Sequence, residues 1–508
     1  MTDQNDQHVV MIVANDVHTD TRVKKEALAL AQGGLRVTIV GLVSQTCPSS
    51  TRMGPVRIVR IPVQFSDREP LLRRTADRWQ ESHTRLQARQ RRAAKRTPVR
   101  AERWVPVRKA RSAVRRVKRR ALRTAAASLG SGEAALRRVD ARLGRVRGWR
   151  WIHPQVLDFE AALGPVIVQL APDVIHAHDM HLVGVAARAC AAVRDRAVPW
   201  VYDAHEYVPG LSQYGGRTAS VIAGWADLEA EFIRDAARVI TVSPAIADAL
   251  ERRYALPRKP AVVLNVPTMN PPDQDSVTPL RDVCGLTDDV PLITYSGGIT
   301  SARGVDTAIY AMAALPEVHL ALVCVPHNDT WYVRRMRQLA ATLGVAERVH
   351  FVNPVSPGQV VGFLRGVDVG LIPGLSFPSH EMSLPNKLFE YLHAGVPIVC
   401  SELESLGAFV REHGVGVTFP PGDADGLAAA VREVLEGNQR YRAACEDEEL
   451  LRRYSWSEQA DELRRVYSGL LGPTLVVPDA GDAPVHEVVD LTEVAPEPAE
   501  TALKAGRP

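Results

Sequence analysis

Apolar runs of strand length alternate with helical stretches through most of this 508-residue chain. The first unit sets the pattern: an apolar run at 8–14, helical spacing over 22–32, two glycines, and a second apolar run at 35–42. A strand, a crossover helix and a second strand in one sheet connect right-handedly, which makes the two strands parallel. The alternation therefore predicts an α/β protein with doubly wound sheets.

The alternation occurs twice, with a segment rich in Pro, Asp and Thr at 265–281 as the predicted linker. The further strands expected in the first series are at 173–177, 198–203, 238–242 and 261–264. Those expected in the second are at 291–295, 319–325, 348–352, 367–372, 397–400 and 415–419. We predict Rossmann-like domains at 8–265 and 282–450, a closing helix at 451–472, and a disordered tail rich in Pro, Glu and Ala at 473–508.

Positive charge is concentrated in one segment. Residues 71–150 hold 26 Lys and Arg against 5 Asp and Glu, whereas the rest of the chain has a net charge of −17. Helix formers dominate there, so we predict a basic helical insert at 66–150 within the first domain. Such a helix suits an anionic membrane surface, contacted through 70–150, although a solvated hairpin without a partner fits equally. Aromatic residues are scarce in the insert, and no nucleic acid partner is expected.

The remaining composition is that of a globular protein, with 46% hydrophobic and 24% charged residues. No apolar run approaches 18 residues, and the first residues are polar, so neither a membrane span nor a secretory signal is expected. We expect a cytoplasmic protein. The basic insert would also allow it to attach peripherally to the inner face of the membrane.

One junction in the second series has the form of an anion site. Residues 383–402 read as a polar loop, a helix of about ten residues and a buried strand. Pro385 suits the first helical position and Gly395 the residue after the last. The free N–H groups of the first turn attract anions, and Lys387 stands in that turn with Glu390 on the same face. The alternative is a surface Lys–Glu pair on an amphipathic helix.

The run 385–391, Pro-Asn-Lys-Leu-Phe-Glu-Tyr, resembles the nucleotide-sugar site of retaining GT-B glycosyltransferases, in particular family 4. The resemblance implies that Glu390 binds the ribose hydroxyls. It places Asn386 and Lys387 at the diphosphate, with Ser383 and Leu384 before them also in contact with the donor.

The sequence departs from the family at one acidic position. Many members carry a second Glu eight residues before the first, where this chain has Met382. Glu381, one position away, is the candidate substitute for contact with the donor sugar.

A second donor-side element opens the second series. Gly297 and Gly298 end a strand, and Arg303 precedes the next helix. Glycines allow close backbone approach to a ligand, and an arginine pairs with phosphate oxygens. A plain strand-to-helix turn is the alternative. The position resembles the family's Gly-rich loop and implies that Arg303 binds the diphosphate.

The first domain offers candidate site residues at the carboxyl edge of its sheet. In open α/β folds, ligands bind at this edge. His205 and Glu206 follow a strand, and the resemblance implies that the histidine contacts the donor sugar near the reacting carbon. Asp16, Asp20 and Arg22 follow the first strand and are candidate acceptor contacts. A helix cap plus a first-turn charge explains them equally.

Two histidines, His176 and His178, share one strand face and could reach one ion. No further ligand cluster accompanies them in the sequence, so we predict no catalytic metal and no cofactor.

The combined interpretation is a GT-B fold in which two Rossmann-like domains face a cleft. The expected activity is metal-independent transfer of a hexose-like sugar, with retention, from a nucleotide-diphosphate sugar to a glycan or lipid-linked acceptor in cell-envelope biosynthesis. Two alternatives stay open: a nucleotide-sugar epimerase or other GT-B enzyme, and a non-catalytic basic adaptor for membrane or nucleic acid.

Overall fold

The computed structural model describes residues 7–43, 47–65, 148–193, 198–214, 216–269 and 276–472, and the backbone of 489–490. The predicted basic insert and its membrane surface lie outside these ranges, except for residues 148–150. The chain forms two compact units. The first comprises Met1–Gln64, Asp158–Ser212 and Glu229–Pro508, and the second comprises Phe65–Leu157 and Gln213–Leu228. Both sheets lie in the first unit.

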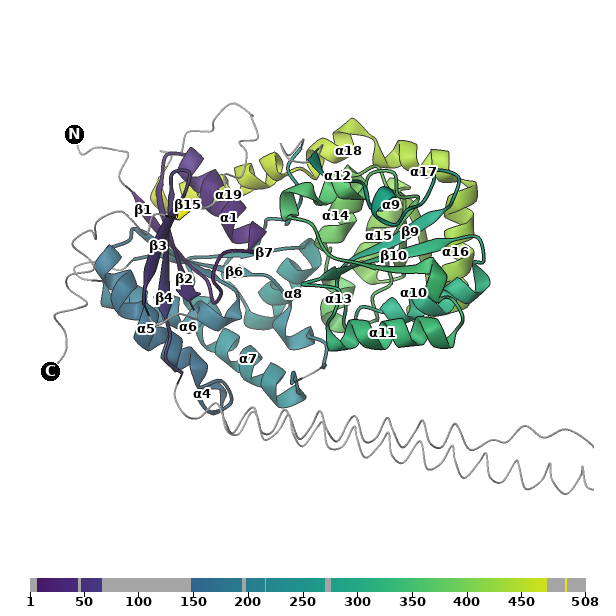
Figure 1. Cartoon of the computed structure of the whole chain (residues 1–508). Helices are drawn as coiled ribbons and strands as arrows, with labels where there is room; N and C mark the ends of the chain where they lie inside the picture. The colour runs from purple at the N-terminus through teal and green to yellow at the C-terminus, as the bar shows by residue number, and fades with distance from the viewer. Residues whose placement is uncertain are drawn as a thin grey trace, which may run out of the picture. The chain divides into compact units, whose positions relative to one another are not determined.

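The first sheet has nine strands in the order β15-β3-β4-β2-β1-β5-β6-β7-β8. Its strands are β1 (His8–Ile12), β2 (Arg36–Val43), β3 (Ser49–Met53), β4 (Val56–Pro62), β5 (Val174–His178), β6 (Trp200–Ala204), β7 (Arg238–Thr241), β8 (Ala261–Val262) and β15 (Val489–Asp490). All neighbours are parallel except β3, which pairs antiparallel with both β4 and β15. The sheet and its helices are on the left of Figure 1.

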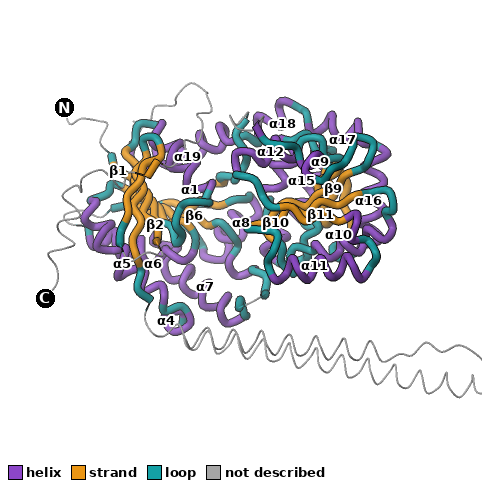
Figure 2. The backbone as a smooth tube through the Cα atoms, viewed as in Figure 1, coloured by secondary structure: helices purple, strands orange, loops and turns teal. Residues whose placement is uncertain are grey.

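Helices cover both faces of this sheet, which explains why its central strands are apolar throughout. Every residue of β1, β5 and β6 is buried. The helices of this half are α1 (Thr21–Gln32), α5 (Gln155–Leu170), α6 (Val183–Ala192), α7 (Ala219–Phe232) and α8 (Pro244–Tyr254). The last helix of the second half, α19 (Trp456–Leu471), packs against α1. Figure 2 shows these helices around the orange strands.

The second sheet has six parallel strands in the order β11-β10-β9-β12-β13-β14. Its strands are β9 (Leu292–Gly298), β10 (His319–Val325), β11 (Val349–Val352), β12 (Val369–Ile372), β13 (Ile398–Ser401) and β14 (Gly416–Phe419). Side chains alternate between two cores: Leu320 and Leu322 face one, while Ala321 and Val323 face the other.

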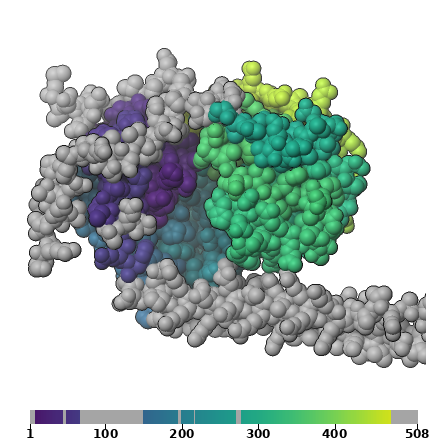
Figure 3. All heavy atoms as spheres, viewed as in Figure 1, coloured from purple at the N-terminus to yellow at the C-terminus, as the bar shows by residue number. Residues whose placement is uncertain are grey.

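The helices of the second half complete its two faces. They are α9 (Leu280–Val283), α10 (Val305–Ala311), α11 (Trp331–Thr342), α12 (Val360–Leu364), α13 (Pro378–Met382), α14 (Asn386–His393), α15 (Glu404–His413), α16 (Ala424–Glu436), α17 (Asn438–Cys445) and α18 (Glu448–Arg453). Residues of α10, α11 and α16 build one core, and residues of α14 and α15 build the other. Figure 3 shows the heavy atoms of this half as spheres, most of them green.

The second unit contains the short helix α4 (Trp149–Ile152) and the first part of α7. The His153 ring stacks on Trp225 with ring centroids 3.5 Å apart, and its Nε2 lies 2.8 Å from the Val221 carbonyl oxygen. A histidine and the α7 backbone thus hold this unit together locally.

Three local predictions need correction. Helix α14 has eight residues, and Pro385 is its N-cap with extended backbone rather than its first helical residue. Strands β3 and β4 were not expected. Within the tail predicted as disordered, Val489–Asp490 form a two-residue strand against β3. By contrast, Gly395 adopts a positive φ of 67° just past α14, as expected for a residue that ends a helix.

Candidate functional site

Gly297, near the end of β9, makes room for a lysine. Gly297 has a φ of 136°, and a Cβ on it would lie 3.2 Å from the Lys387 Nζ. The same ammonium lies 5.0 Å from the ring centroid of Tyr295, whose hydroxyl donates to the Gly298 carbonyl oxygen at 2.8 Å. Glycine at 297 therefore lets the Lys387 amine approach the strand end closely.

The loop that carries Arg303 is fixed against the end of β12. Gly304 has a φ of 65°, and a Cβ there would lie 1.8 Å from the Pro373 carbonyl oxygen, so only glycine fits. The Leu375 N–H donates to the Ala302 carbonyl oxygen at 3.1 Å. These contacts place Arg303 next to the segment that leads into α13.

Helix α14 is attached to the sheet through the last residue of its motif. Tyr391 is fully buried, and its hydroxyl accepts a hydrogen bond from the Ser296 N–H at 3.0 Å. Gly370 is needed beneath it, since a Cβ there would lie 2.5 Å from the tyrosine ring. The attachment sets the start of α14, with Asn386 exposed and Lys387 half-buried, at the carboxyl edge of the sheet.

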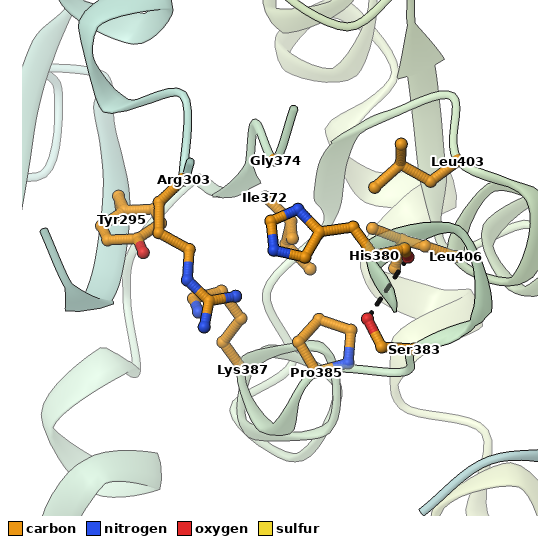
Figure 4. Close-up of a pocket in the computed structure, with 10 residues that line it drawn as sticks. All are labelled: Tyr295, Arg303, Ile372, Gly374, His380, Ser383, Pro385, Lys387, Leu403 and Leu406. Atoms are coloured by element: carbon orange, nitrogen blue, oxygen red, sulfur yellow. Dashed lines mark hydrogen bonds between the residues drawn. The ribbon is translucent and has the colours of Figure 1, made fainter. Parts of the chain in front are cut away.

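Arg303 and Lys387 meet in one pocket, which encloses about 350 Å³ when the space open to solvent is included. Figure 4 shows the two cationic side chains reaching the same space from different elements. The pocket is lined by Tyr295, Arg303, Ile372, Gly374, His380, Ser383, Pro385, Lys387, Leu403 and Leu406.

Burial disfavours the charged forms of both Lys387 and Glu390. Burial and then the Arg303 guanidinium lower the pKa of Lys387 to about 8, and the Glu390 carboxylate opposes them only in part. Burial raises the pKa of Glu390, against the attraction of Lys387 and Lys25. Two like charges beside a single carboxyl group form a site that an anion would stabilise.

The acidic candidate Glu381 is engaged elsewhere. One of its oxygens accepts from the Ser376 hydroxyl, and the other accepts from the Glu404 N–H at 2.8 Å, which caps the start of α15. Glu381 is not among the residues that line the pocket. Ser383 does line it, whereas Leu384 packs against the core beside α14.

In the first half, His205 follows β6 and is oriented by a buried carboxylate. Its Nε2 lies 3.0 Å from Asp203 Oδ2, and the histidine side chain is 22% exposed. Burial disfavours the charged ring, but the Asp203 and Asp179 carboxylates raise the pKa of His205 to about 9. His205 is therefore an imidazolium at neutral pH.

Arg22 does not face the cleft, which corrects that expectation. Its side chain is 4% exposed and donates to both oxygens of Asp203, from Nε at 2.7 Å and from Nη2 at 2.8 Å. It also lies 3.0 Å from Glu26. Arg22 supports the Asp203–His205 pair from beneath instead of meeting an acceptor.

The other first-half candidates form the loop before α1 and the end of β6. Asp20 caps α1 by accepting from the Val23 N–H at 3.2 Å. This is the helix-cap role that the sequence offered as the alternative to an acceptor contact. Asp16 is exposed and accepts from the His18 N–H at 3.0 Å. Glu206 is half-buried next to His205.

Four buried side chains of the first half have potential ligand atoms within 4.8 Å of one another: Glu26, His176, His178 and Asp203. The rings of His176 and His178 stack with centroids 4.3 Å apart, as the shared strand face predicted. Arg22 already forms charged contacts with both carboxylates of this group. A metal ion there would meet its guanidinium, so the geometry favours an ion-pair network.

Two residues near the pocket were missed by sequence reasoning. His380 lines the pocket two residues before Met382, and Lys25 on α1 is buried, donates to the Val266 carbonyl oxygen at 2.6 Å and lies within electrostatic reach of Glu390. Pro378 at a helix start signalled a turn of helix before the motif, but no local pattern distinguished His380. Lys25 carried no signal because its contacts come from distant segments.

Two open, mainly parallel sheets with helices on their faces, and a cationic pocket at the carboxyl edge of the second, are typical of a GT-B protein. Residues 278–449 match the family model "Glycosyl transferases group 1", and residues 110–266 match "Glycosyltransferase Family 4". Each model covers about a third of the chain, and together the two matches and the fold support a GT-B glycosyltransferase of group 1.

Curated relatives are similar over parts of their length. A D-inositol 3-phosphate glycosyltransferase of Xylanimonas cellulosilytica is 30% identical over 43% of this chain and 52% of its own. An uncharacterized glycosyltransferase of Methanocaldococcus jannaschii is 26% identical over 58% of this chain and 75% of its own. The chain thus spans about half of the first relative and three quarters of the second.

Solved structures agree on the fold. The sucrose-phosphate synthase of Thermosynechococcus elongatus superposes with a TM-score of 0.62 at 16% identity, covering 91% of this chain and 99% of that one. WaaG, a glycosyltransferase involved in lipopolysaccharide biosynthesis, superposes with a TM-score of 0.53 at 13% identity, covering 91% and 100%. In the part of the chain that the structure describes, no helix is long and apolar enough to cross a membrane.

Proposed function

We propose that this chain transfers a glycosyl group from a nucleoside diphosphate sugar to an acceptor hydroxyl, with retention at the anomeric carbon. The observation that carries the proposal is the convergence of Arg303 and Lys387 at the Gly297 end of β9. Charge-assisted contacts of this kind suit the oxygens of a diphosphate. The uncapped start of α14 adds backbone N–H groups on the same side.

Relatives support the donor class. Anabaena HepE has been solved in complex with UDP and with UDP and glucose, and it superposes with TM-scores of 0.53 and 0.56 at 14% identity. An Escherichia coli protein entitled trehalose-6-phosphate is bound with UDP-2-fluoro glucose and superposes with a TM-score of 0.54. In this chain Glu390 would take the ribose hydroxyls and Asn386 the phosphates.

The proposed reaction breaks the bond between the anomeric carbon and the diphosphate oxygen, and the electron pair leaves with the nucleoside diphosphate. A bond from the acceptor oxygen to the same face of that carbon forms, and the acceptor proton passes to an oxygen of the departing diphosphate. Arg303 and Lys387 stabilise the charge that develops there, with each contact accounting for roughly one to two decades of rate. His205, as an imidazolium, would donate to the sugar and cannot act as a base.

The first test is a panel of UDP- and GDP-sugars measured by thermal shift, followed by transfer assays with the stabilising donor and NMR of the product anomer. We expect one nucleotide class to stabilise the protein and the product to keep the donor's anomeric configuration. Turnover of the donor without acceptor would support the epimerase alternative. Absence of any nucleotide affinity would support the adaptor alternative.

We further propose that residues 70–150 bring the enzyme to an anionic membrane surface, where an envelope or lipid-linked acceptor would be found. The support is the concentrated positive charge of residues 71–150, at roughly 1 kcal/mol per Lys or Arg near the surface. Co-sedimentation with anionic vesicles, with and without residues 70–150, tests it. Equal binding by both proteins would refute it.

A further inference from the structure

His380 lies in the middle of the pocket and has no role in the proposed reaction so far. It belongs to α13, which begins at Pro378 just before the motif loop. Figure 4 shows its imidazole between the Arg303 and Lys387 side of the pocket and the side formed by Leu403 and Leu406. The ring is thus placed next to the position where a diphosphate would end.

The hydrogen bond on one side of the ring determines which nitrogen faces the pocket as an acceptor. Nδ1 lies 2.8 Å from the Leu375 carbonyl oxygen, and a carbonyl can only accept, so Nδ1 carries the proton. Burial, followed by the charges of Arg303 and Lys387, lowers the pKa of His380, although the Leu375 carbonyl and the Glu381 carboxylate oppose the change. The ring is therefore neutral, and Nε2 is left with a free lone pair.

The pocket walls separate two kinds of chemistry. Figure 4 shows the cations Arg303 and Lys387 on one side and the aliphatic Leu403 and Leu406 on the other, with Ile372 near the His380 ring. In a nucleoside diphosphate sugar the group next to the diphosphate is the sugar ring, which combines hydroxyl donors with apolar C–H edges. A neutral acceptor set between cations and an aliphatic wall matches such a ring.

The carboxylate that could have filled this role is not available. Position 382 is a methionine, and both oxygens of Glu381 are used by Ser376 and by the start of α15. Among the side chains that line the pocket, His380 alone offers an acceptor nitrogen, and the hydroxyls of Ser383 and Tyr295 already donate to backbone carbonyl oxygens. The cations beside His380 can only donate.

We propose that Nε2 of His380 accepts a hydrogen bond from one hydroxyl of the donor sugar and thereby selects donors that carry it. Leu403 and Leu406 bound the apolar edge of the same ring. The inference rests on the proposed function, because it requires a nucleotide-sugar in the pocket.

The test is a kinetic cycle between protein variants and donor analogues. kcat/KM is measured for the parent nucleotide-sugar and for its 2-, 3-, 4- and 6-deoxy analogues, with wild type, His380→Ala, His380→Gln and the control His319→Ala. His319 begins β10, at the opposite edge of the same sheet from the pocket. Circular dichroism and thermal unfolding check that each variant is folded.

We expect wild type and His319→Ala to lose roughly ten- to hundredfold on one deoxy analogue. With the parent sugar, kcat/KM of His380→Ala should be lower than that of wild type by a similar factor. With that deoxy analogue, wild type and His380→Ala should have the same kcat/KM. His380→Gln, which keeps an acceptor oxygen, should recover part of the loss on the parent. Because the ring is neutral, the wild-type preference should be equal at pH 7 and pH 8.

Outcomes separate the two proposals. If wild type transfers sugar and the deoxy penalties are the same in His380→Ala, the selection by His380 is refuted while the transferase proposal stands. If wild type neither binds nor turns over any nucleotide-sugar, both proposals are refuted.

Discussion

Replacing Asp203 by asparagine would remove the buried carboxylate that pairs with two cations, Arg22 and His205. Arg22 donates to both of its oxygens, and His205 and His178 lie 3.0 and 3.2 Å from Oδ2. All of the Asp203 side chain is buried. Burial alone would raise the pKa of this carboxyl group, but Arg22 and His205 hold it well below its usual value. The carboxylate is therefore charged at neutral pH.

The structure gives the size of the effect. Removing one partner of a buried ion pair costs roughly 3–5 kcal/mol, because the other charge stays buried. Part of that cost depends on pH, since the pKa of His205 is raised from 6.5 to about 9. A difference of this size corresponds to roughly 3 kcal/mol. This contribution is complete below pH 6.5 and is lost as the pH rises through about 9.

The assay is urea unfolding followed by tryptophan fluorescence at several pH values between 6 and 9.5. In Asp203→Asn, burial is opposed only by the more distant Asp179 carboxylate, so the pKa of His205 falls. We expect the variant's deficit in unfolding free energy to be largest near pH 6 and to narrow as the pH approaches 9.5.

A matched control is Asp368→Asn in the second half. Asp368 accepts from Arg281 Nη2 at 2.7 Å and from the Leu292 N–H at 2.8 Å, with no histidine among these partners. Its loss should cost stability by an amount that is constant over this pH range. If the deficit of Asp203→Asn were equally constant, the reasoning that Asp203 sets the charge of His205 would be wrong.

The remaining predictions concern the second half. Arg303→Ala should weaken nucleoside diphosphate binding roughly ten- to hundredfold in calorimetry. Lys387→Met should do the same while raising the melting temperature of the free protein, because a buried like charge is removed; a lower melting temperature would contradict this. In wild type, affinity should fall above pH 8 as Lys387 loses its proton, and a flat profile to pH 10 would refute that assignment. Tyr391→Phe should cost roughly 1–3 kcal/mol of unfolding free energy by leaving the buried Ser296 N–H without its acceptor, and an unchanged urea midpoint would contradict it.

The sheets could be predicted because their central strands are apolar on both faces and their connecting helices are amphipathic. The β3–β4 hairpin could not, since it lies at the sheet edge and its residues are only partly buried. In β4, half-buried arginines at 57 and 60 interrupt the apolar run. Edge strands carry a weaker pattern because one side of their backbone meets no further long strand.

The residues of the candidate site also fall into two groups, those that a local pattern indicates and those that only distant contacts place. Lys387 and Gly297 could be placed from local patterns, because a few neighbouring residues are enough to indicate a helix start or a strand end. Arg22 was misplaced because its partner Asp203 is 181 residues away, and no local spacing reveals that contact. His380 was missed for a related reason, since the fold alone brings it next to Arg303 and Lys387.

Two charged clusters in the described part of the chain differ in how far their own groups neutralise one another. This difference indicates where an anionic ligand would bind. In the first half the groups around Asp203 are shifted towards the charged form: the pKa of Asp203 is lowered, and those of Arg22 and His205 are raised. The buried Glu26, His176 and His178 beside them are shifted towards the neutral form. In the second half the shifts run the other way, because the pKa of Lys387 is lowered and that of Glu390 is raised. In the first half Asp203 thus already pairs with the two cations, Arg22 and His205, that it contacts. The second keeps its cation at an energetic cost, and a bound diphosphate would remove that cost.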